Sequence, residues 1–349
     1  MKIDIDRTDL LNLVNIKLGL YKPISKLCSD SEYKSIIEKH NIKNNFFPIP
    51  FNLYGKKNLT LTPSKKTNLF YKKKLVGIFN INTKNSYNLE KHNKKIFGTN
   101  DKNHLGVKIY SKKIKSKPNF LGGSFKLTNH KIIKKTFKEN FESVKEIKKI
   151  KNKKNYIVFS TRNIIHSGHD LIIDKLLKKE KKILIVVLLS EKKKFKKNLL
   201  KKFYKQFIKQ KKYFLNVKVN FLEIPTFFAG PREASFQSKI FENLGFGFFY
   251  VGRDHAGYEN YYSKFSSQNF TKKLNLKIKI IGFNEPMYCL QCNTTVLNKL
   301  KLRKQCCVCK SDKLINISGT LIRKNIKQSK SINKLFSSNH LSFVKKHLF

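Results

Sequence analysis

The clearest structural pattern of the chain lies in residues 156–189, YIVFSTRNIIHSGHDLIIDKLLKKEKKILIVVLL. It opens on a short apolar run, continues through a polar segment and an amphipathic stretch, and closes on a second apolar run. Continuous runs of Val, Ile, Leu and Phe are typical of strands that helices cover on both faces. The stretch therefore predicts a strand, a turn, a helix over 169–178 and a second strand, which is one unit of a parallel α/β sheet.

The same rhythm continues down the chain. Three further apolar runs predict strands, and three segments between the runs predict helices. The strands span 217–224, 247–252 and 277–283, and the helices span 198–214, 232–244 and 258–273. Residues 150–284 are thus predicted to form a Rossmann-like catalytic domain with a parallel sheet, which binds its ligands at the carboxyl ends of the strands.

Residues 1–140 have a different rhythm, with short extended pieces broken by Pro, Gly and Asn. The segments 47–54, 74–81 and 104–110 are predicted strands of a compact, mostly β domain. A lysine-rich segment at 145–154 marks the boundary to the next domain. Residues 285–349 are predicted to form a small C-terminal segment that contains the cysteine cluster.

Lysine dominates the composition. The 349 residues contain 75 Lys+Arg against 22 Asp+Glu, a formal net charge of +53, and only six of the basic residues are arginine. Taken alone, such a net charge indicates a nucleic-acid or membrane-surface partner. Because the lysines are spread over every segment, we interpret them as a solvated coat that reflects AT-rich codon usage, which disfavours a nucleic-acid partner. The longest clean apolar run, 183–189, is far shorter than the roughly 20 residues of a membrane span.

The first ten residues and the distribution of the cysteines predict the cellular compartment of the protein. The opening MKIDIDRTDL carries charges where a secretory signal needs an apolar segment, so a cytoplasmic protein is expected. Five of the six cysteines gather between residues 289 and 309, as metal ligands do in a reducing compartment. Two C-x-x-C pairs separated by thirteen residues predict a zinc ribbon with a closed, structural Zn²⁺. Its ligands would be Cys289, Cys292, Cys306 and Cys309, with the role of Cys307 open.

The polar segment after the first predicted strand carries His166 and His169, three residues apart, with Gly168 between them. At a helix start both imidazoles would lie on one side of the first turn, beside backbone N–H groups that favour anions. H-x-G-H is therefore predicted to handle phosphate. On its own the motif is weak, because a histidine near a helix start is more often a cap or a surface residue.

Three later motifs strengthen this prediction. AGPREA at 229–234 and VGRDHAG at 251–257 follow predicted strands, and ISGTLIR at 317–323 begins a predicted helix. Arginine in these motifs has a physical reason in a lysine-biased chain, because its planar guanidinium binds phosphate or sulfate bidentately. We expect the motifs that follow strands to converge on one rim. The alternatives are local: a salt bridge or cap for Asp254, a surface charge for Arg232, and an ordinary N-cap for ISGTLIR.

FSTRN, HSGH, AGPREA, VGRDHAG and ISGTLIR resemble, in order and approximate spacing, the motifs of the ATP sulfurylase (sulfate adenylyltransferase) family of the nucleotidyltransferase superfamily. FPIPFNL, IFGTNDKNHLGV and NFLGG resemble the PUA-like N-terminal domain of that family. The resemblance implies that sulfate attacks the α-phosphate of ATP in line, giving adenosine 5'-phosphosulfate and pyrophosphate, in either direction and with Mg²⁺ on the nucleotide. It also implies a homodimer, and a zinc site in some members.

The same resemblance implies the site residues. Arg162 should grip sulfate with help from the backbone at Ala256. The catalytic set is Thr161, Arg162, Asn163, His166 and His169, with Thr161 and Asn163 positioning the reacting phosphate and the two histidines stabilising the charge of the α- and β-phosphates. The full set of substrate contacts is Ser160, Arg162, Asn163, His166, His169, Arg232, Gly252, Arg253, Asp254, His255, Ala256, Ser318, Thr320 and Arg323.

The sulfate half departs from the family pattern. The family has glutamine where this chain has Ser160 and proline where it has Ile164, and Thr226, Phe227 and Glu259 also differ. The shorter serine side chain predicts a weaker sulfate site. Three alternatives therefore stay open: an adenylyltransferase with another acceptor, a decayed inactive copy and, from another class, a basic RNA-binding protein whose binding falls steeply with salt.

Overall fold

The computed structural model describes residues 2–57, 66–179, 181–189, 197–210, 213, 215–297, 313–328 and 330–348. The chain divides into two compact units: residues 1–153 with 222–280 form unit 1, and residues 154–221 with 281–349 form unit 2. This division differs from the predicted boundaries, because segment 222–280 packs with the N-terminal residues. Asn15, for example, is fully buried and donates from Nδ2 to the carbonyl oxygen of Glu223 at 3.1 Å.

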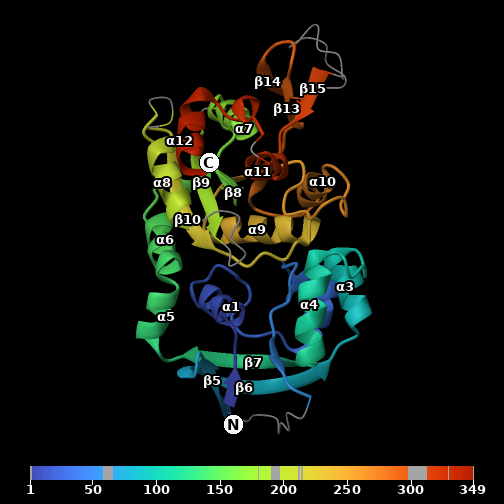
Figure 1. The fold of residues 1–349 in the computed structure, drawn as a ribbon. Helices are drawn as coiled ribbons and strands as arrows, with labels where there is room; N and C mark the ends of the chain where they lie inside the picture. The colour runs from blue at the N-terminus through green and yellow to red at the C-terminus, as the bar shows by residue number, and fades with distance from the viewer. Residues whose placement is uncertain are drawn as a thin grey trace. The chain divides into compact units, whose positions relative to one another are not determined.

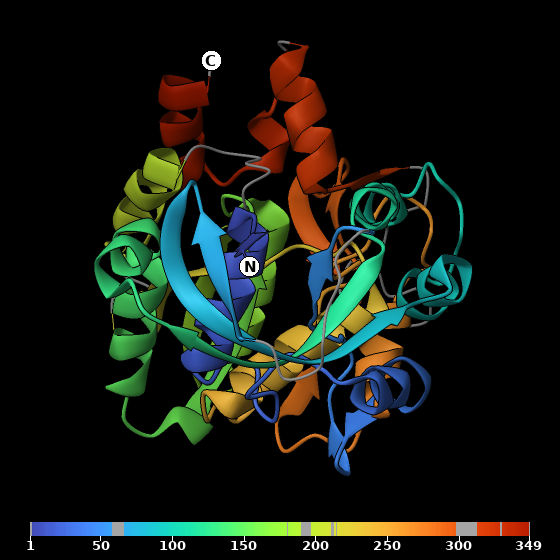
Figure 2. The same ribbon diagram turned by 90° about the horizontal axis from the view of Figure 1, so that it is seen from below.

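Unit 1 contains a five-stranded mixed sheet in the order β1-β5-β6-β7-β4. β1 is parallel to β5, and the other neighbours are antiparallel. Register shifts after Leu69 and Ile81 bend the sheet, and Figure 2 shows its long strands curling. The strands are β1 (Lys2–Asp4), β4 (Leu53–Gly55), β5 (Lys66–Tyr71), β6 (Lys74–Ser86) and β7 (Asn119–Leu127), with a hairpin of β2 (Asn41–Ile42) and β3 (Asn45–Phe46). The predicted strand at 74–81 is confirmed.

Several helices of unit 1 begin at a residue whose side chain caps the first turn. Ser29 and Glu32 form a capping box at α2, each side chain bonding the other residue's backbone N–H. The helices are α1 (Arg7–Lys17), α2 (Asp30–Lys39), α3 (Leu89–Phe97), α4 (Leu105–Ser116), α5 (His130–Thr136), α6 (Lys138–Lys148), α9 (Pro231–Asn243) and α10 (Ser266–Lys272). The strand β11 (Phe248–Tyr250) follows α9 in unit 1. A short helical turn, η1 (Lys153–Asn155), and the strand β12 (Lys279–Ile281) lie at the unit boundaries in sequence.

The predicted strand at 104–110 is wrong, because this segment opens α4. The His104 side chain accepts a hydrogen bond from the backbone N–H of Val107 at 3.3 Å and so caps the helix. Val107 and Ile114, seven residues apart, are both buried and lie on one helical face. Apolar residues alternate over 104–110, which is typical of a strand. The seven-residue spacing of the buried Val107 and Ile114 is instead that of one face of a helix.

Unit 2 contains the predicted strand-turn-helix-strand. β8 (Tyr156–Thr161) is parallel to β9 (Lys182–Leu189), with Tyr156 opposite Lys182 and Thr161 opposite Val187. α7 (Ser167–Leu177) joins them, and β10 (Val217–Glu223) follows on the other side of β9. The prediction of parallel pairing is confirmed for β8 and β9, and a fully parallel sheet across 150–284 stays a prediction. α8 (Lys197–Phe207) ends seven residues before the predicted limit.

The C-terminal part of unit 2 builds a three-stranded sheet and two helices (Figure 1). β13 (Pro286–Cys289) pairs antiparallel with β14 (Thr294–Leu297) on one side and with β15 (Leu314–Asn316) on the other. α11 (Gly319–Lys327), η3 (Asn333–Leu335) and α12 (Ser338–Leu348) follow. Within the described part of the chain, no helix combines the length and apolarity needed to span a bilayer.

Candidate functional site

The turn between β8 and α7 carries the first motif and is fixed from several sides. Ile164 and Ile165 are almost fully buried, which anchors the turn in the core of unit 2. The backbone N–H of Asn163 donates to Thr161 Oγ1 at 3.1 Å, and Tyr204 Oη donates to the carbonyl oxygen of Asn163 at 2.7 Å. Thr161, the last residue of β8, and Asn163 thus stand in one hydrogen-bonded turn at the end of the strand.

His166 and His169 lie together at the start of α7. The N–H of His169 donates to His166 Nδ1 at 3.4 Å, so His166 is the N-cap residue, and the two rings stack with centroids 3.7 Å apart. Because Nδ1 accepts a hydrogen bond, the proton of a neutral His166 ring sits on Nε2. A Cβ at Gly168 would lie 3.2 Å from the His166 ring and 3.1 Å from Pro286 Cγ, so a larger residue there would crowd the His166 ring.

Both imidazoles are neutral at neutral pH. Burial lowers the pKa of His169 to about 4, with a smaller opposing effect from Asp170. Burial, together with the neighbouring His169, lowers the pKa of His166 well below its ordinary value. The pair therefore offers hydrogen-bond donors rather than standing positive charges, and an incoming phosphate would favour protonation.

A buried polar cluster that the sequence did not reveal holds α7 against the C-terminal helix. His340 Nδ1 on α12 lies 3.2 Å from Asp170 Oδ2, and Tyr213 Oη donates to Asp170 Oδ1 at 3.1 Å. The other ring nitrogen of His340 lies 2.8 Å from Gln210 Nε2. His340 is only 2% exposed. In the sequence, the one indication of this cluster was Asp170, directly after His169. Its partner His340 lies 170 positions away.

ISGTLIR occupies the start of α11 in unit 2. Ser318 caps this helix, since the N–H of Leu321 donates to Ser318 Oγ at 3.1 Å. Ser318 is thus the N-cap residue of α11, and its contact with substrate stays a prediction. Thr320 and Arg323 lie in α11, and their side chains fall outside the part of the chain that the structure describes.

VGRDHAG forms a closed loop after β11 in unit 1. The N–H of Gly230 donates to the carbonyl oxygen of Ala256 at 3.1 Å, which joins this loop to AGPREA. A Cβ at Gly257 would lie 2.0 Å from Asp254 Oδ1, so any larger residue there would displace the Asp254 carboxylate. This loop contains Gly252, Arg253, Asp254, His255 and Ala256. Their contact with the nucleotide and their convergence with the β8 motif stay predictions.

Arg232 needs a correction. Arg232 is 6% exposed, and its guanidinium donates to the carbonyl oxygens of Ile37 at 2.6 Å and Pro48 at 2.9 Å. Burial lowers the pKa of Arg232 to about 10, which still leaves it charged at neutral pH. Its donors face one backbone carbonyl near the end of α2 and one in the segment after β3. The structure thus gives this residue a structural role instead of the predicted substrate contact.

The described cysteines of the predicted metal site lie on a hairpin. Cys289 ends β13, Cys292 lies in the turn before β14, and the N–H of Cys292 donates to Cys289 Sγ at 3.4 Å. Neither is in a disulfide. Cys306, Cys307 and Cys309 lie outside the described residues. Among the residues that the structure does describe, no three His, Cys, Asp or Glu side chains form a group that could hold a metal.

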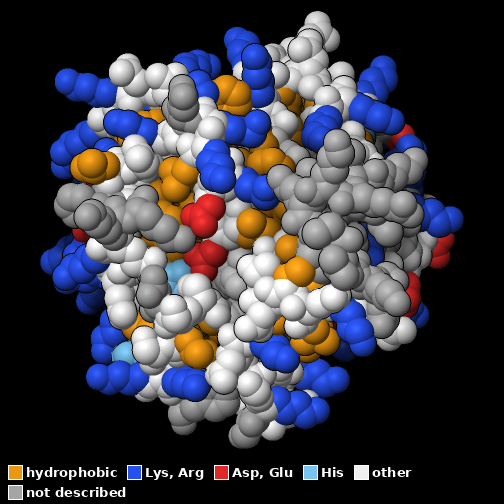
Figure 3. Space-filling model, turned by 90° about the horizontal axis from the view of Figure 1, so that it is seen from above, with side chains coloured by type: hydrophobic (Ala, Val, Ile, Leu, Met, Phe, Trp, Pro, Cys, Tyr) orange, Lys and Arg blue, Asp and Glu red, His pale blue; other side chains and the backbone are white. Residues whose placement is uncertain are grey.

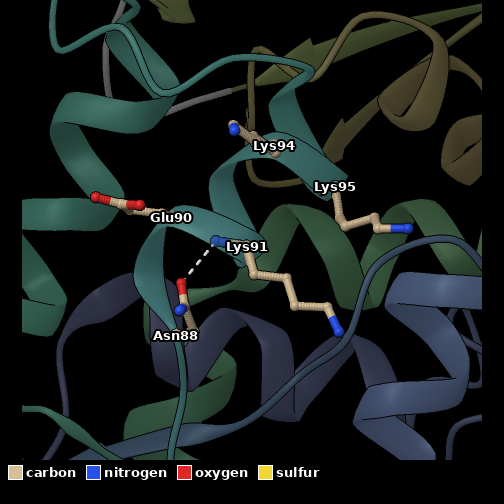
Figure 4. A pocket seen from close by; sticks show the side chains of 5 residues that line it. All are labelled: Asn88, Glu90, Lys91, Lys94 and Lys95. Carbon is tan, nitrogen blue, oxygen red and sulfur yellow. Dashed lines mark hydrogen bonds between the residues drawn. The ribbon is translucent and has the colours of Figure 1, made fainter.

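Two surface features lie outside the motifs: a pocket on α3 and the scattered Lys and Arg side chains. A pocket on α3 is lined by Asn88, Glu90, Lys91, Lys94 and Lys95 (Figure 4). Asn88 caps α3 through the N–H of Lys91, and Lys91 and Lys95 both pair with Glu38, so these groups serve local structure. On the face drawn in Figure 3, the Lys and Arg side chains are scattered among polar and apolar ones, as expected of a solvated coat.

Comparison with known proteins agrees with the motifs. A family model for ATP-sulfurylase matches residues 135–344, and one for a PUA-like domain matches residues 1–130. A sulfate adenylyltransferase of Ignicoccus hospitalis is 27% identical over 340 residues, which cover 95% of this chain and 86% of the relative. That of Carboxydothermus hydrogenoformans is 26% identical and covers 99% of this chain and 91% of the relative.

A solved structure shares the fold. The hexameric APS kinase from Thiobacillus denitrificans matches with a TM-score of 0.68 at 11% identity, over 99% of this chain and 62% of that one. This identity supports a likeness of fold alone. The family match, in contrast, spans more than half of the chain and contains every motif from the β8 turn to α11. The chain therefore belongs to the ATP sulfurylase family.

Proposed function

We propose that this chain is a sulfate adenylyltransferase, which interconverts ATP and sulfate with adenosine 5'-phosphosulfate and pyrophosphate. The observation that carries the proposal is the stacked, neutral pair His166 and His169 at the start of α7, in a chain of the ATP sulfurylase family. Curated relatives that match nearly the whole chain carry this name. The enzyme is thus a nucleotidyltransferase.

The reaction needs no covalent enzyme intermediate. A sulfate oxygen forms a bond to the α-phosphorus of ATP while the bond from that phosphorus to the bridging oxygen breaks, and pyrophosphate leaves with the electron pair. Sulfate is a weak nucleophile, so alignment and stabilisation of negative charge supply the catalysis. Mg²⁺ enters with the nucleotide substrate and neutralises phosphate charge.

The β8 motif handles the reacting groups. Arg162 binds two sulfate oxygens through its guanidinium, and Thr161 and Asn163 fix the turn that aims it. The Nε2–H of His166 donates to a phosphate oxygen, and His169 acts beside it. Because both rings start neutral, each can also take on positive charge as pyrophosphate accumulates negative charge.

The remaining motifs hold the nucleotide. Gly252, Arg253, Asp254, His255 and Ala256 are the contacts that we propose in unit 1, with Arg253 as the main cation. Ser318, Thr320 and Arg323 are those that we propose in unit 2. We also propose a homodimer, which the family resemblance supports. We propose a cytoplasmic location, which the cysteine usage supports.

The test is ATP formation from adenosine 5'-phosphosulfate and pyrophosphate with Mg²⁺. Activity that needs both substrates is expected. Folded protein that binds ATP but forms none would overturn the proposal, and a screen of other oxyanions would then show whether the acceptor has changed. Steeply salt-dependent RNA binding without turnover would favour the binding-protein alternative instead.

Ser160→Gln is expected to lower the KM for sulfate by about tenfold, because the longer amide restores a hydrogen bond to a charged oxyanion. Ser160 is the second-last residue of β8, opposite Val186, and lies two positions before the predicted sulfate-binding residue Arg162. Steady-state kinetics in the sulfate-consuming direction measure it, with an unchanged KM for ATP as the internal control. An unchanged sulfate KM would show that serine supports the site fully.

We also propose that Cys289, Cys292, Cys306 and Cys309 hold a structural Zn²⁺. The two described ligands fit the ion, since both thiols sit on one tight hairpin and a backbone N–H is directed at the Cys289 sulfur. Four thiolates would brace the segment that leads into β15 and α11.

Anaerobically prepared protein is expected to contain about one zinc per chain, and Cys289→Ser and Cys292→Ser should each lose it. Cys28→Ala is the matched control, because Cys28 is a buried cysteine of unit 1 outside the cluster. Elemental analysis gives the metal content directly. Zinc-free native protein would remove the proposal.

A further inference from the structure

α9 carries two buried polar residues one turn apart, Glu233 and Gln237, that form a chain of hydrogen bonds within unit 1. Glu233 Oε2 accepts from the backbone N–H groups of Phe227 at 3.1 Å and Phe228 at 2.7 Å. Glu233 Oε1 accepts from Gln237 Nε2 at 3.4 Å, and Gln237 Oε1 lies 2.9 Å from His255 Nε2. Both α9 side chains are only 1% exposed. The chain therefore connects the loop before α9 to the histidine of GRDHAG.

The direction of these hydrogen bonds follows from the donors. The Glu233 carboxylate already accepts from three backbone N–H groups, those of Phe227, Phe228 and Ala229. It therefore acts as an acceptor, and the NH₂ of Gln237 must face it. The amide oxygen of Gln237 then faces His255. An amide oxygen cannot donate, so His255 Nε2 must carry the ring proton. The orientation of one buried amide thus selects the tautomer of His255.

The surroundings also fix the plane of the His255 ring. The ring meets Phe249 edge-to-face, with centroids 5.4 Å apart and an interplanar angle of 85°. Ser267 Oγ donates to the carbonyl oxygen of His255 at 2.9 Å, which ties down its backbone. A buried amide costs free energy unless it is bonded, and an apolar residue would serve the core of α9 equally well. Gln237 is therefore better explained by its partner than by packing.

We propose that Gln237, held by Glu233, is a positioning residue that keeps His255 in the Nε2–H tautomer and in a fixed orientation for the nucleotide. This inference rests on the proposed function, in which His255 contacts the nucleotide. Gln237→Leu should raise the KM for adenosine 5'-phosphosulfate by about three- to tenfold, the worth of one hydrogen bond, while kcat changes little.

Two variants and one control test the proposal. In the double variant Glu233→Gln with Gln237→Glu, the introduced amide can accept from the loop N–H groups and donate to the introduced carboxylate, which still accepts from His255. This swap should restore a near-native KM, whereas Glu233→Gln alone should not. Ser238→Ala removes a buried hydroxyl from the same helix and should leave the KM unchanged, because this hydroxyl donates to the carbonyl oxygen of Ala234 within α9.

The tautomer is read independently of activity from ¹⁵N spectra of histidine-labelled protein, with the His255 signals assigned from a His255→Asn variant. Native protein should show His255 protonated at Nε2, and Gln237→Leu should change that signal. Protonation at Nδ1 in the native protein, or an unchanged spectrum and KM in Gln237→Leu, would overturn the proposal. If Gln237→Leu fails to fold, the proposal is tested by the ¹⁵N spectrum of the native protein and by the KM of the double variant. Native protein without ATP-forming activity would contradict the proposed function and leave the tautomer measurable.

Discussion

Arg162→Ala is expected to lower kcat/KM for ATP formation from adenosine 5'-phosphosulfate and pyrophosphate by about a thousandfold. Arg162 follows β8 in the turn that Thr161 and Asn163 hold, and a guanidinium binds two oxygens of a sulfate group at once. Arg162→Lys keeps the charge but loses this paired geometry, so it should recover only part of the activity.

The matched control is Lys178→Ala, which also removes one cation from the same strand-helix segment. Lys178 is the exposed C-cap residue of α7, at the far end of the helix from the motif. It should leave kcat/KM near the native value. Equal losses in both variants would mean that overall charge attracts the anionic substrates, and near-native activity of Arg162→Ala would remove this residue from the site.

The elements around the first motif could be predicted because their apolar periods are long and unbroken. β8, β9 and α7 follow the spacing that strands and helices require. The helix predicted over 258–273 is shorter, 266–272, because Glu259 and Phe265 adopt positive φ values of 48° and 65°. Side chains other than glycine rarely take this conformation, so nothing in the local sequence marks the loop.

The partners of polar side chains were hard to predict because they lie far apart in sequence. The motif identified Arg232 as a cation in the right neighbourhood, but its carbonyl acceptors on Ile37 and Pro48 lie about 190 positions away. The contact between Asp170 and His340 is equally remote. Short-range patterns identify the residues of a site, whereas only the tertiary fold separates those that face a substrate from those that support the backbone.

His166→Ala and His169→Ala are each expected to lower kcat/KM by about a hundredfold or more, because each removes a donor to the phosphates. Their effects on stability should differ. His166 caps α7, so alanine there should also cost about 1 kcal/mol in the free energy of unfolding. His166→Asn provides a capping oxygen again and should recover stability without activity. Kinetics and urea unfolding of the three variants separate the two roles, and joint recovery of both properties in His166→Asn would contradict a catalytic role.

The neutral state of His169 gives this prediction a pH signature. Burial holds its pKa near 4, below the ordinary value of 6.5. Between these values the unfolded chain binds a proton that the folded chain does not, so the free energy of unfolding falls as the pH drops from 6.5 towards 4. His169→Gln removes this titration and should reduce the pH dependence in that window by up to about 1.4 kcal/mol per pH unit. Saturating pyrophosphate should weaken the dependence in the native protein as well, because its charge favours the protonated ring. Parallel curves for native and variant protein would mean that His169 titrates normally, and a neutral donor at the start of α7 would then be the wrong mechanism.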